Sequence, residues 1–230
     1  VWKDTRQGER MTAMKEAANA KNFILRVKDV PVVLDQLERW NNSEGHKLFK
    51  RLDLKRIGMS GHSFGAVTTQ AVSGQNFGGG KIALTDSRIK AAIVFSPSSP
   101  RVGDPRQAFG SVKIPWLLMT GTKDSGTIVD IGAESRLGVF PALPAGGKYE
   151  LVLDGAEHSV FTDRALPGES GKRNPNHHKV ILALSTAFWD AWLRNDPAAK
   201  AWLDGDGPQS VMEKNDRWRK KIGASPRVTP

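Results

Sequence analysis

The 230-residue chain contains no cysteine. This absence excludes disulfides, thiolate metal sites and a cysteine nucleophile, and it leaves the redox compartment open. The chain also lacks any run of about 18 apolar residues, so we expect no membrane-spanning segment. Aromatic residues are scarce, at 7% of the sequence, and they are too sparse around the basic cluster Arg217, Arg219, Lys220 and Lys221 to form a platform for bases. Despite a net charge of +10, we therefore expect a solvated basic tail and no nucleic-acid partner.

The sequence shows no composition shift that would mark a linker between domains. A chain of this length can bury one substantial core, so residues 1–230 are predicted to form a single domain. The segment 78–81, Gly-Gly-Gly-Lys, lacks the earlier glycine and the Ser or Thr of a phosphate loop, which excludes that function.

The hydrophobic pattern predicts helices and strands in alternation, which is typical of an α/β protein with a mostly parallel sheet flanked by helices. A first helix is expected to be capped by Asp29, with Pro31 in its first turn and Val33, Leu34, Leu37 and Trp40 on its apolar face. The remaining elements are expected as strands in 54–60, 88–96, 114–121 and 149–154, helices in 66–72 and 179–194, a loop in 96–110, a short cap or pocket wall in 128–147, and short helical pieces in the tail.

The segment 61–65 has the pattern Gly-His-Ser-Phe-Gly. Gly-x-Ser-x-Gly between a strand and a helix is typical of a nucleophile elbow, which presents the serine on a sharp turn at the carboxyl end of the strand. We expect the glycines at 61 and 65 to relieve crowding there, because they have no Cβ and tolerate positive φ. A predicted strand before the motif and a predicted helix behind it supply the required context. Ser63 is therefore predicted to be a nucleophile, the alternative being a turn with an incidental serine.

A serine nucleophile needs a histidine base and an acid that orients the histidine. Behind a nucleophile elbow these partners follow in the order acid, then histidine, each after a later strand. Asp124 comes just after the strand in 114–121, and His158 lies in the loop after the strand in 149–154. We therefore predict Asp124 as the orienting acid and His158 as the base. The alternatives are a turn aspartate and an ordinary loop histidine.

Other histidines fit the role of the base less well. His62 stands beside the serine and cannot fold back onto it, so it is expected to line the pocket or to pack below the turn. His177 and His178 open the predicted helix after Pro175, where a helix amino terminus disfavours imidazolium, and we expect surface or capping roles for them. His46 lies in a polar loop and is expected to be solvated.

Three other acids compete with Asp124 for the role of the orienting acid. Asp130 follows it closely and is its chief competitor. Asp154 and Glu157 precede the predicted base by four residues and by one residue, which is too local for the usual orienting geometry.

The elbow at 61–65, the strand end at 120–124 and the segment 153–158, Leu-Asp-Gly-Ala-Glu-His, together resemble the α/β-hydrolase superfamily. Within it they resemble the dienelactone-hydrolase-like group, whose relatives include platelet-activating-factor acetylhydrolases and bacterial polyester hydrolases. True dienelactone hydrolases have a cysteine nucleophile where this chain has Ser63. The resemblance therefore implies an α/β-hydrolase fold and serine-type hydrolysis of a small-molecule carboxylic ester through an acyl-enzyme. It implies the backbone N–H of Phe64 as an oxyanion-hole donor, and no metal or organic cofactor.

The chain departs from the family pattern at its start. Family members have several strands and a helix before the region that Val1 matches, including the loop that supplies the other oxyanion donor. We therefore expect this chain to lack the N-terminal strands of the fold, to receive the second donor from outside it, and to leave one edge of the sheet uncovered. Localisation, oligomeric state and the acyl and alcohol groups of the substrate stay open.

Two other function classes also stay open. A serine peptidase or acyltransferase on the same fold would use the same three residues with a different leaving group or acceptor. A non-catalytic binding protein with an α/β-hydrolase-like fold would keep the scaffold without the catalytic geometry.

Overall fold

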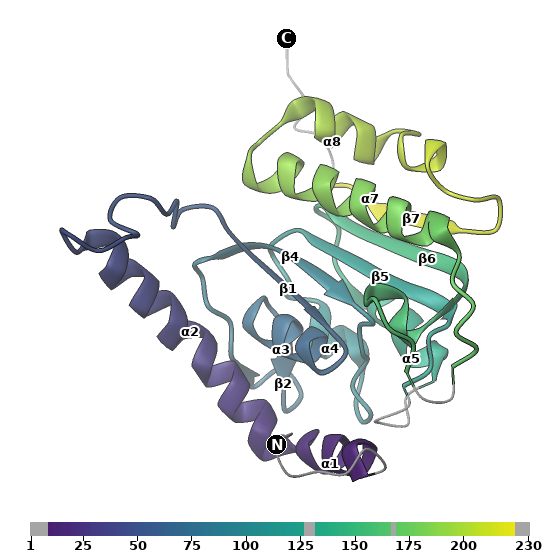
Figure 1. The fold of residues 1–230 in the computed structure, drawn as a ribbon, viewed down its shortest axis with the longest axis horizontal. Helices are drawn as coiled ribbons and strands as arrows, with labels where there is room; N and C mark the ends of the chain where they lie inside the picture. The colour runs from purple at the N-terminus through teal and green to yellow at the C-terminus, as the bar shows by residue number, and fades with distance from the viewer. Residues whose placement is uncertain (1–8, 127–131, 167–168, 224–230) are drawn as a thin grey trace.

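The computed structural model describes residues 9–126, 132–166 and 169–223. Its centre is a five-stranded sheet in the order β1-β4-β5-β6-β7 (Figure 1). The first four of these strands run parallel to one another, and β7 pairs with β6 in the antiparallel direction. The α/β class is thus confirmed, as a mostly parallel sheet flanked by helices. The strands of the sheet are β1 (Ile57–His62), β4 (Ile89–Phe95), β5 (Trp116–Lys123), β6 (Lys148–Glu157) and β7 (Arg217–Lys221).

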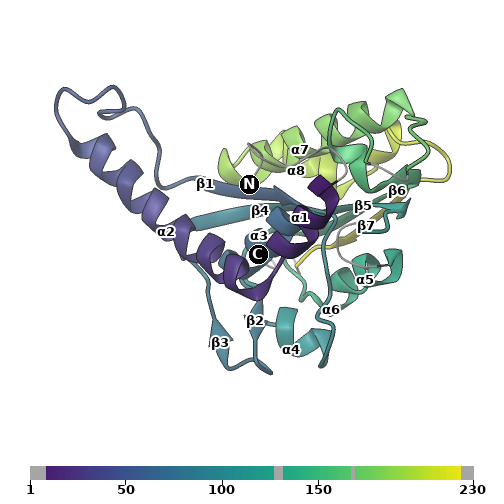
Figure 2. The same ribbon diagram turned by 60° about the horizontal axis from the view of Figure 1, so that its bottom comes forward.

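Helices cover both faces of the sheet, with α7 and α8 on one face and α3, α4 and α6 on the other (Figures 1 and 2). β4 is apolar almost throughout because its successive side chains enter two different cores. Ala91 and Ile93 pack with α7, whereas Ala92 and Val94 pack with α3 and α6. The helices are α1 (Arg10–Ala17), α2 (Ala20–Asn42), α3 (Phe64–Val72), α4 (Pro105–Phe109), α5 (Ala133–Leu137), α6 (Val139–Ala142), α7 (Pro175–Leu193) and α8 (Pro197–Asp204), with 3₁₀ turns η2 (His158–Phe161) and η3 (Pro208–Ser210).

The first long helix begins about ten residues earlier than the sequence analysis predicts. Asn19, not Asp29, caps α2, and its side chain accepts a hydrogen bond from the backbone N–H of Asn22 at 2.9 Å. Pro31 consequently lies inside the helix and not in its first turn. A proline usually interrupts a helix because it lacks an N–H and crowds the preceding turn, and for this reason the local sequence favours a helix that starts close to Pro31.

The predicted apolar face of this helix is also partly wrong. Leu34 is buried, but Val33 and Trp40 are 54% and 39% exposed. Four inward-facing apolar residues of α2 are spaced by four, three and four positions, which is a helical repeat that continues through the proline. They are Phe23, Val27, Val30 and Leu34.

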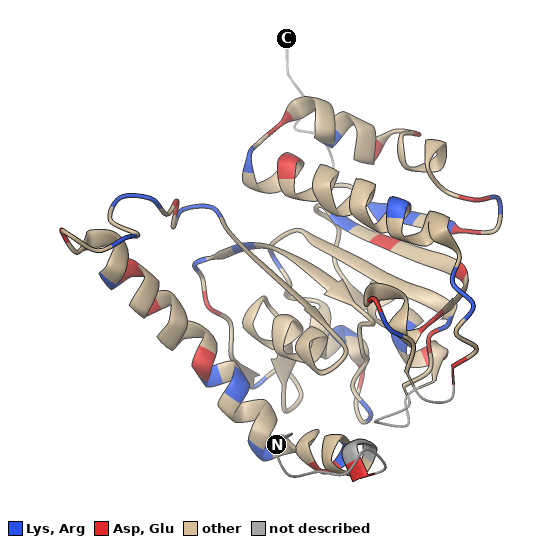
Figure 3. Cartoon of the chain, in the orientation of Figure 1, with Lys and Arg blue, Asp and Glu red and all other residues tan. Residues whose placement is uncertain are grey.

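The basic cluster near the C-terminal end forms β7 and is not a solvated tail, so that prediction is wrong. Arg219 forms an ion pair with the buried carboxylate of Glu150 on β6, with Nη2 2.5 Å from Oε2. Lys221 Nζ donates to the carbonyl oxygens of Pro141 and Leu143 at 2.9 and 2.6 Å. Over the described residues as a whole, basic and acidic side chains are interspersed (Figure 3).

Several smaller elements refine the predictions. The predicted loop 96–110 contains α4, which Asp104 caps and which has Pro105 in its first turn. The triglycine segment 78–80 joins two short strands, β2 (Asn76–Phe77) and β3 (Ile82–Ala83), into a hairpin beside α4 (Figure 2). The region 128–147 contains α5 and α6, and the helix predicted in 179–194 begins earlier, at Pro175.

Candidate active site

Ser63 lies at the sharp junction between β1 and α3. Its backbone has φ 58° and ψ −115°, and its N–H donates to the carbonyl oxygen of Phe95 at 3.1 Å. Positive φ is uncommon for a residue with a Cβ, and such strained residues gather at functional sites. The turn leaves the serine half-buried at the carboxyl end of its strand, where a ligand can reach it.

The two glycines of the motif do different things. A Cβ on Gly61 would lie 2.3 Å from the carbonyl oxygen of Gly65, so the turn can close only with glycine at that position. A Cβ on Gly65 would meet nothing nearer than the Arg26 guanidinium at 4.0 Å. Positive φ occurs at Ser63 and at neither glycine. The expectation that both glycines relieve crowding is therefore correct for Gly61 only.

The three residues predicted as nucleophile, base and acid form one chain of hydrogen bonds. Ser63 Oγ is 2.9 Å from His158 Nε2, and His158 Nδ1 is 2.6 Å from Asp124 Oδ1. The three side chains meet because each follows the carboxyl end of a parallel strand, respectively β1, β6 and β5, and those ends lie along one edge of the sheet. His158 and Asp124 are 3% and 0% exposed.

The Asp124 carboxylate is held from both of its oxygens. Oδ2 accepts a hydrogen bond from the Thr120 hydroxyl at 2.8 Å, and Oδ1 lies 3.2 Å from Nε of Arg136. Burial acts to raise the pKa of Asp124, but the hydrogen bond to His158 and the charge of Arg136 outweigh it. The pKa of this carboxyl therefore lies below its usual value, and Asp124 is ionised at neutral pH.

Arg136 is a site residue that the sequence analysis missed. It belongs to the five-residue helix α5, and its side chain is only 2% exposed. Its Nη2 lies 3.4 Å from His158 Nδ1, on the side of the ring that faces Asp124. The signal in the sequence was weak, because a lone arginine usually lies at the surface.

His62 packs against the predicted base, His158. The two imidazole centroids are 4.6 Å apart, and His62 Nε2 is 3.0 Å from the carbonyl oxygen of His158. Burial, followed by the neighbouring His158, lowers the pKa of His62 to about 4. His62 is therefore neutral at pH 7. Its Nε2–H can donate to the carbonyl oxygen of His158 and so hold the backbone of His158 in place.

The remaining histidines lie apart from this group. His177 is buried in α7, which contradicts the expected surface or capping role, while His178 is exposed and bonds to the carbonyl oxygen of Val160 at 2.9 Å. His46 stacks on Trp40 with ring centroids 5.0 Å apart, so it is half-buried and not fully solvated.

The competing acids do not approach His158 Nδ1 in the part of the chain that is described. Asp154 is exposed and accepts a hydrogen bond from Thr122, and Glu157 accepts hydrogen bonds from Ser170. Asp130 lies outside the described residues.

Phe64 is the first residue of α3. The N–H groups in the first turn of a helix have no partner inside the helix and point toward the space before it. That space lies next to Ser63, because the serine immediately precedes the helix. The position suits an anion or a developing negative charge.

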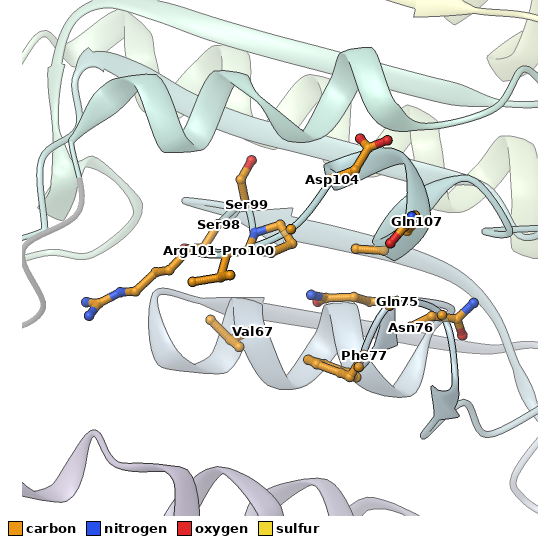
Figure 4. Close-up of a pocket in the computed structure, with 16 residues that line it drawn as sticks. Val67, Gln75, Asn76, Phe77, Ser98, Ser99, Pro100, Arg101, Asp104 and Gln107 are labelled. Atoms are coloured by element: carbon orange, nitrogen blue, oxygen red, sulfur yellow. The ribbon is translucent and has the colours of Figure 1, made fainter.

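A cavity of about 340 Å³ lies beside α3, between the β2–β3 hairpin and the loop that follows β4 (Figure 4). Val67 forms part of its wall and lies one helical turn after Ser63, to whose carbonyl oxygen it donates at 3.2 Å. Two hydrogen bonds of 2.9 and 3.0 Å tie the Gln70 amide to the backbone of Ser98 and hold the loop against the helix. The cavity therefore begins within one turn of the serine along α3.

Comparison with known proteins adds no assignment to this geometry. No protein-family model matches the chain, and no curated protein matches it. Among the described residues, no group of three or more His, Asp or Glu side chains is arranged to hold a metal ion. None of the helices in the described segments is both long enough and apolar enough to cross a membrane.

Proposed function

We propose that this protein is a serine hydrolase that cleaves carboxylic esters through an acyl-enzyme, on an α/β-hydrolase fold. The observation that carries the proposal is the continuous hydrogen-bond chain from Ser63 Oγ through His158 to Asp124. The strained backbone of the serine supports it, because a nucleophile elbow requires that strain.

Proton transfer follows from the two ring nitrogens of His158. Nδ1 carries a proton that forms a hydrogen bond with the ionised Asp124, so Nε2 has a free lone pair that faces Ser63 Oγ. As the serine oxygen attacks the ester carbonyl carbon, Nε2 takes its proton. Asp124 stabilises the resulting imidazolium and holds the ring in this tautomer.

The carbonyl oxygen of the ester becomes negatively charged during this attack. The backbone N–H of Phe64 would donate to that oxygen at the start of α3. In α/β-hydrolases the second donor comes from a loop before the elbow strand. His158 then gives its proton to the leaving alcohol, and in the second half of the reaction it activates the water that hydrolyses the acyl-enzyme.

The test combines turnover with covalent labelling. The protein should hydrolyse a p-nitrophenyl ester of a short acid and should be labelled by a fluorophosphonate at Ser63, and Ser63→Ala should abolish both. Ser60→Ala is a matched control, because Ser60 is an exposed serine three residues earlier, on β1. Labelling that persists unchanged in Ser63→Ala would refute the proposed nucleophile.

A second measurement separates ester hydrolysis from the other reactions that the same three residues could perform. An ester and an amide with the same acyl group should be compared, with and without an added alcohol as acceptor. We expect faster cleavage of the ester and release of the free acid. Preferential amide cleavage would indicate a peptidase, and transfer to the alcohol would indicate an acyltransferase.

A further inference from the structure

Arg136 makes more contacts with the site than its position in a short helix suggests. Its Nε lies 3.2 Å from Asp124 Oδ1 and 3.4 Å from the Asp124 carbonyl oxygen. Its Nη1 donates to the carbonyl oxygens of Ser96 and Pro97 at 2.9 and 3.1 Å and to the Ser98 hydroxyl at 3.0 Å. One buried guanidinium thus joins the loop after β5 to the loop after β4.

These two loops carry or border the reacting groups. The loop after β5 bears Asp124, and the loop after β4 follows Phe95, whose carbonyl oxygen accepts the N–H of Ser63. A planar guanidinium has five N–H donors in fixed directions, so it can contact both loops at once. A lysine has the same charge but presents it as a point, without this fork.

We propose that Arg136 is a positioning residue of the candidate site, which holds the Asp124 carboxylate ionised and aimed at His158 Nδ1 while it fixes the two loops to each other. The inference rests on the proposed function, because a positioning role has meaning only if Asp124 orients a catalytic histidine. Arg136 itself is separated from Ser63 by the imidazole ring and acts through Asp124.

The geometry explains why the carboxylate needs this partner. Asp124 is 0% exposed, and a buried carboxylate is stable in its charged form only when charges and hydrogen bonds replace its water. His158 Nδ1 and Arg136 Nε both lie close to the same oxygen, Oδ1, at 2.6 and 3.2 Å, while the Thr120 hydroxyl donates to Oδ2. Arg136 Nη2 lies 3.4 Å from His158 Nδ1, so the guanidinium lies against both partners of the contact between Asp124 and His158.

The experiment compares Arg136→Met and Arg136→Lys with a matched control, Arg219→Met, which breaks a partly buried ion pair with Glu150 at the other end of β6. We expect kcat for ester hydrolysis to fall by about tenfold to a hundredfold in both Arg136 variants, since a misplacement of about 1 Å can cost a hundredfold. KM should stay nearly constant. Arg219→Met should lower the melting temperature and leave kcat unchanged.

A double-mutant cycle distinguishes positioning from a general effect on stability. If Arg136 acts through Asp124, the variant that combines Arg136→Met with Asp124→Asn should be no slower than Asp124→Asn alone. Losses that multiply in the double variant, or a kcat that is unchanged or raised in Arg136→Met, would overturn the proposal.

Nuclear magnetic resonance tests the inference without turnover and on the unaltered protein. The Arg136 Nε–H proton should exchange slowly with water, and its signal should shift when Ser63 is phosphonylated or when His158 is titrated. The downfield Nδ1–H signal, assigned by its loss in His158→Gln, should move in the Arg136 variants and stay in place in Arg219→Met. Rapid exchange of the Arg136 proton and no response to His158 would overturn the proposal even if the variants failed to fold. A protein that neither cleaves esters nor is labelled at Ser63 would instead refute the proposed function.

Discussion

The replacement Asp124→Asn removes one negative charge from the candidate site and nearly preserves its shape. Oδ1 faces two donors, His158 Nδ1 at 2.6 Å and Arg136 Nε at 3.2 Å. Oδ2 faces the Thr120 hydroxyl, which can accept a hydrogen bond as well as donate one. The new amide should therefore place its oxygen at the Oδ1 position and its NH₂ group toward Thr120. His158 then keeps its proton on Nδ1, and the loss of activity comes from the missing charge.

The size of that loss can be worked out from the distances. In Asp124→Asn the charge of Arg136 is no longer neutralised, and Nη2 lies 3.4 Å from the ring nitrogen of His158. Two unit charges about 4 Å apart interact by about 4 kcal/mol at an effective dielectric constant of about 20. Since about 1.4 kcal/mol corresponds to a tenfold change in rate, kcat/KM should fall by about a hundredfold to a thousandfold. This loss is smaller than the roughly ten-thousandfold loss in a serine protease whose orienting aspartate is replaced by asparagine, where the histidine takes the wrong tautomer.

The assay is the initial rate of p-nitrophenyl acetate hydrolysis, normalised to the active sites that a fluorophosphonate titrates. Asp154→Asn is the matched control, because this carboxylate is exposed on the same strand that leads to His158, and its rate should stay within about twofold. A loss of less than about tenfold in Asp124→Asn would refute the charge argument. A larger loss in Asp130→Asn than in Asp124→Asn would transfer the role of the acid to Asp130.

Three further predictions concern backbone fit, burial and capping. Gly61→Ala should slow fluorophosphonate labelling of Ser63 by about a hundredfold, because the new methyl group would lie 2.3 Å from the Gly65 carbonyl oxygen. Labelling at the normal rate would show that the turn can adjust to the methyl group. Burial lowers the pKa of Lys148 from 10.5 to about 8, so between these pH values the unfolded chain binds more protons than the folded chain. The free energy of unfolding should therefore rise between pH 8 and pH 10.5, by about 1.4 kcal/mol per pH unit. Chemical denaturation from pH 8 upward should show this rise in the unaltered protein and a flatter profile in Lys148→Met, and equal slopes would contradict it. Asn19→Ala should cost about 1 kcal/mol of stability as the loss of a helix cap, whereas Asp29→Ala should cost less, and the opposite ranking would favour a later start of the helix.

The elements that the sequence could predict are those whose signal is local. The candidate elbow is recognisable because a strand, a glycine-flanked serine and a helix of small residues follow one another within about 20 residues of sequence. Asp124 and His158 could be placed because parallel strands bring their carboxyl ends to one edge, whatever the details of packing. The structure brings both residues to hydrogen-bond distance in the predicted order.

The elements that the sequence could not predict depend on contacts between distant segments. Arg136 is buried because loops 12 and 40 residues away supply its acceptors, and nothing in its own neighbourhood indicates this. The basic residues of β7 become a strand because Glu150, 69 positions before Arg219, offers a buried carboxylate. α2 extends through Pro31 because the packing of its apolar face outweighs the local cost of the proline.

The place of β1 in the sheet divides the candidate site into two regions of unequal local stability. Within the described residues β1 has a hydrogen-bonded neighbour on one side only, whereas β5 and β6 have neighbours on both. Amide protons of such a strand should exchange with deuterium earlier than those of the inner strands, because less structure must open to expose them. Opening of β1 would carry Ser63 away while His158 and Asp124 stayed in contact. Mild denaturant should then abolish fluorophosphonate labelling of Ser63 before the amide protons of the inner strands lose their protection from exchange. The protein would pass through a folded but inactive state.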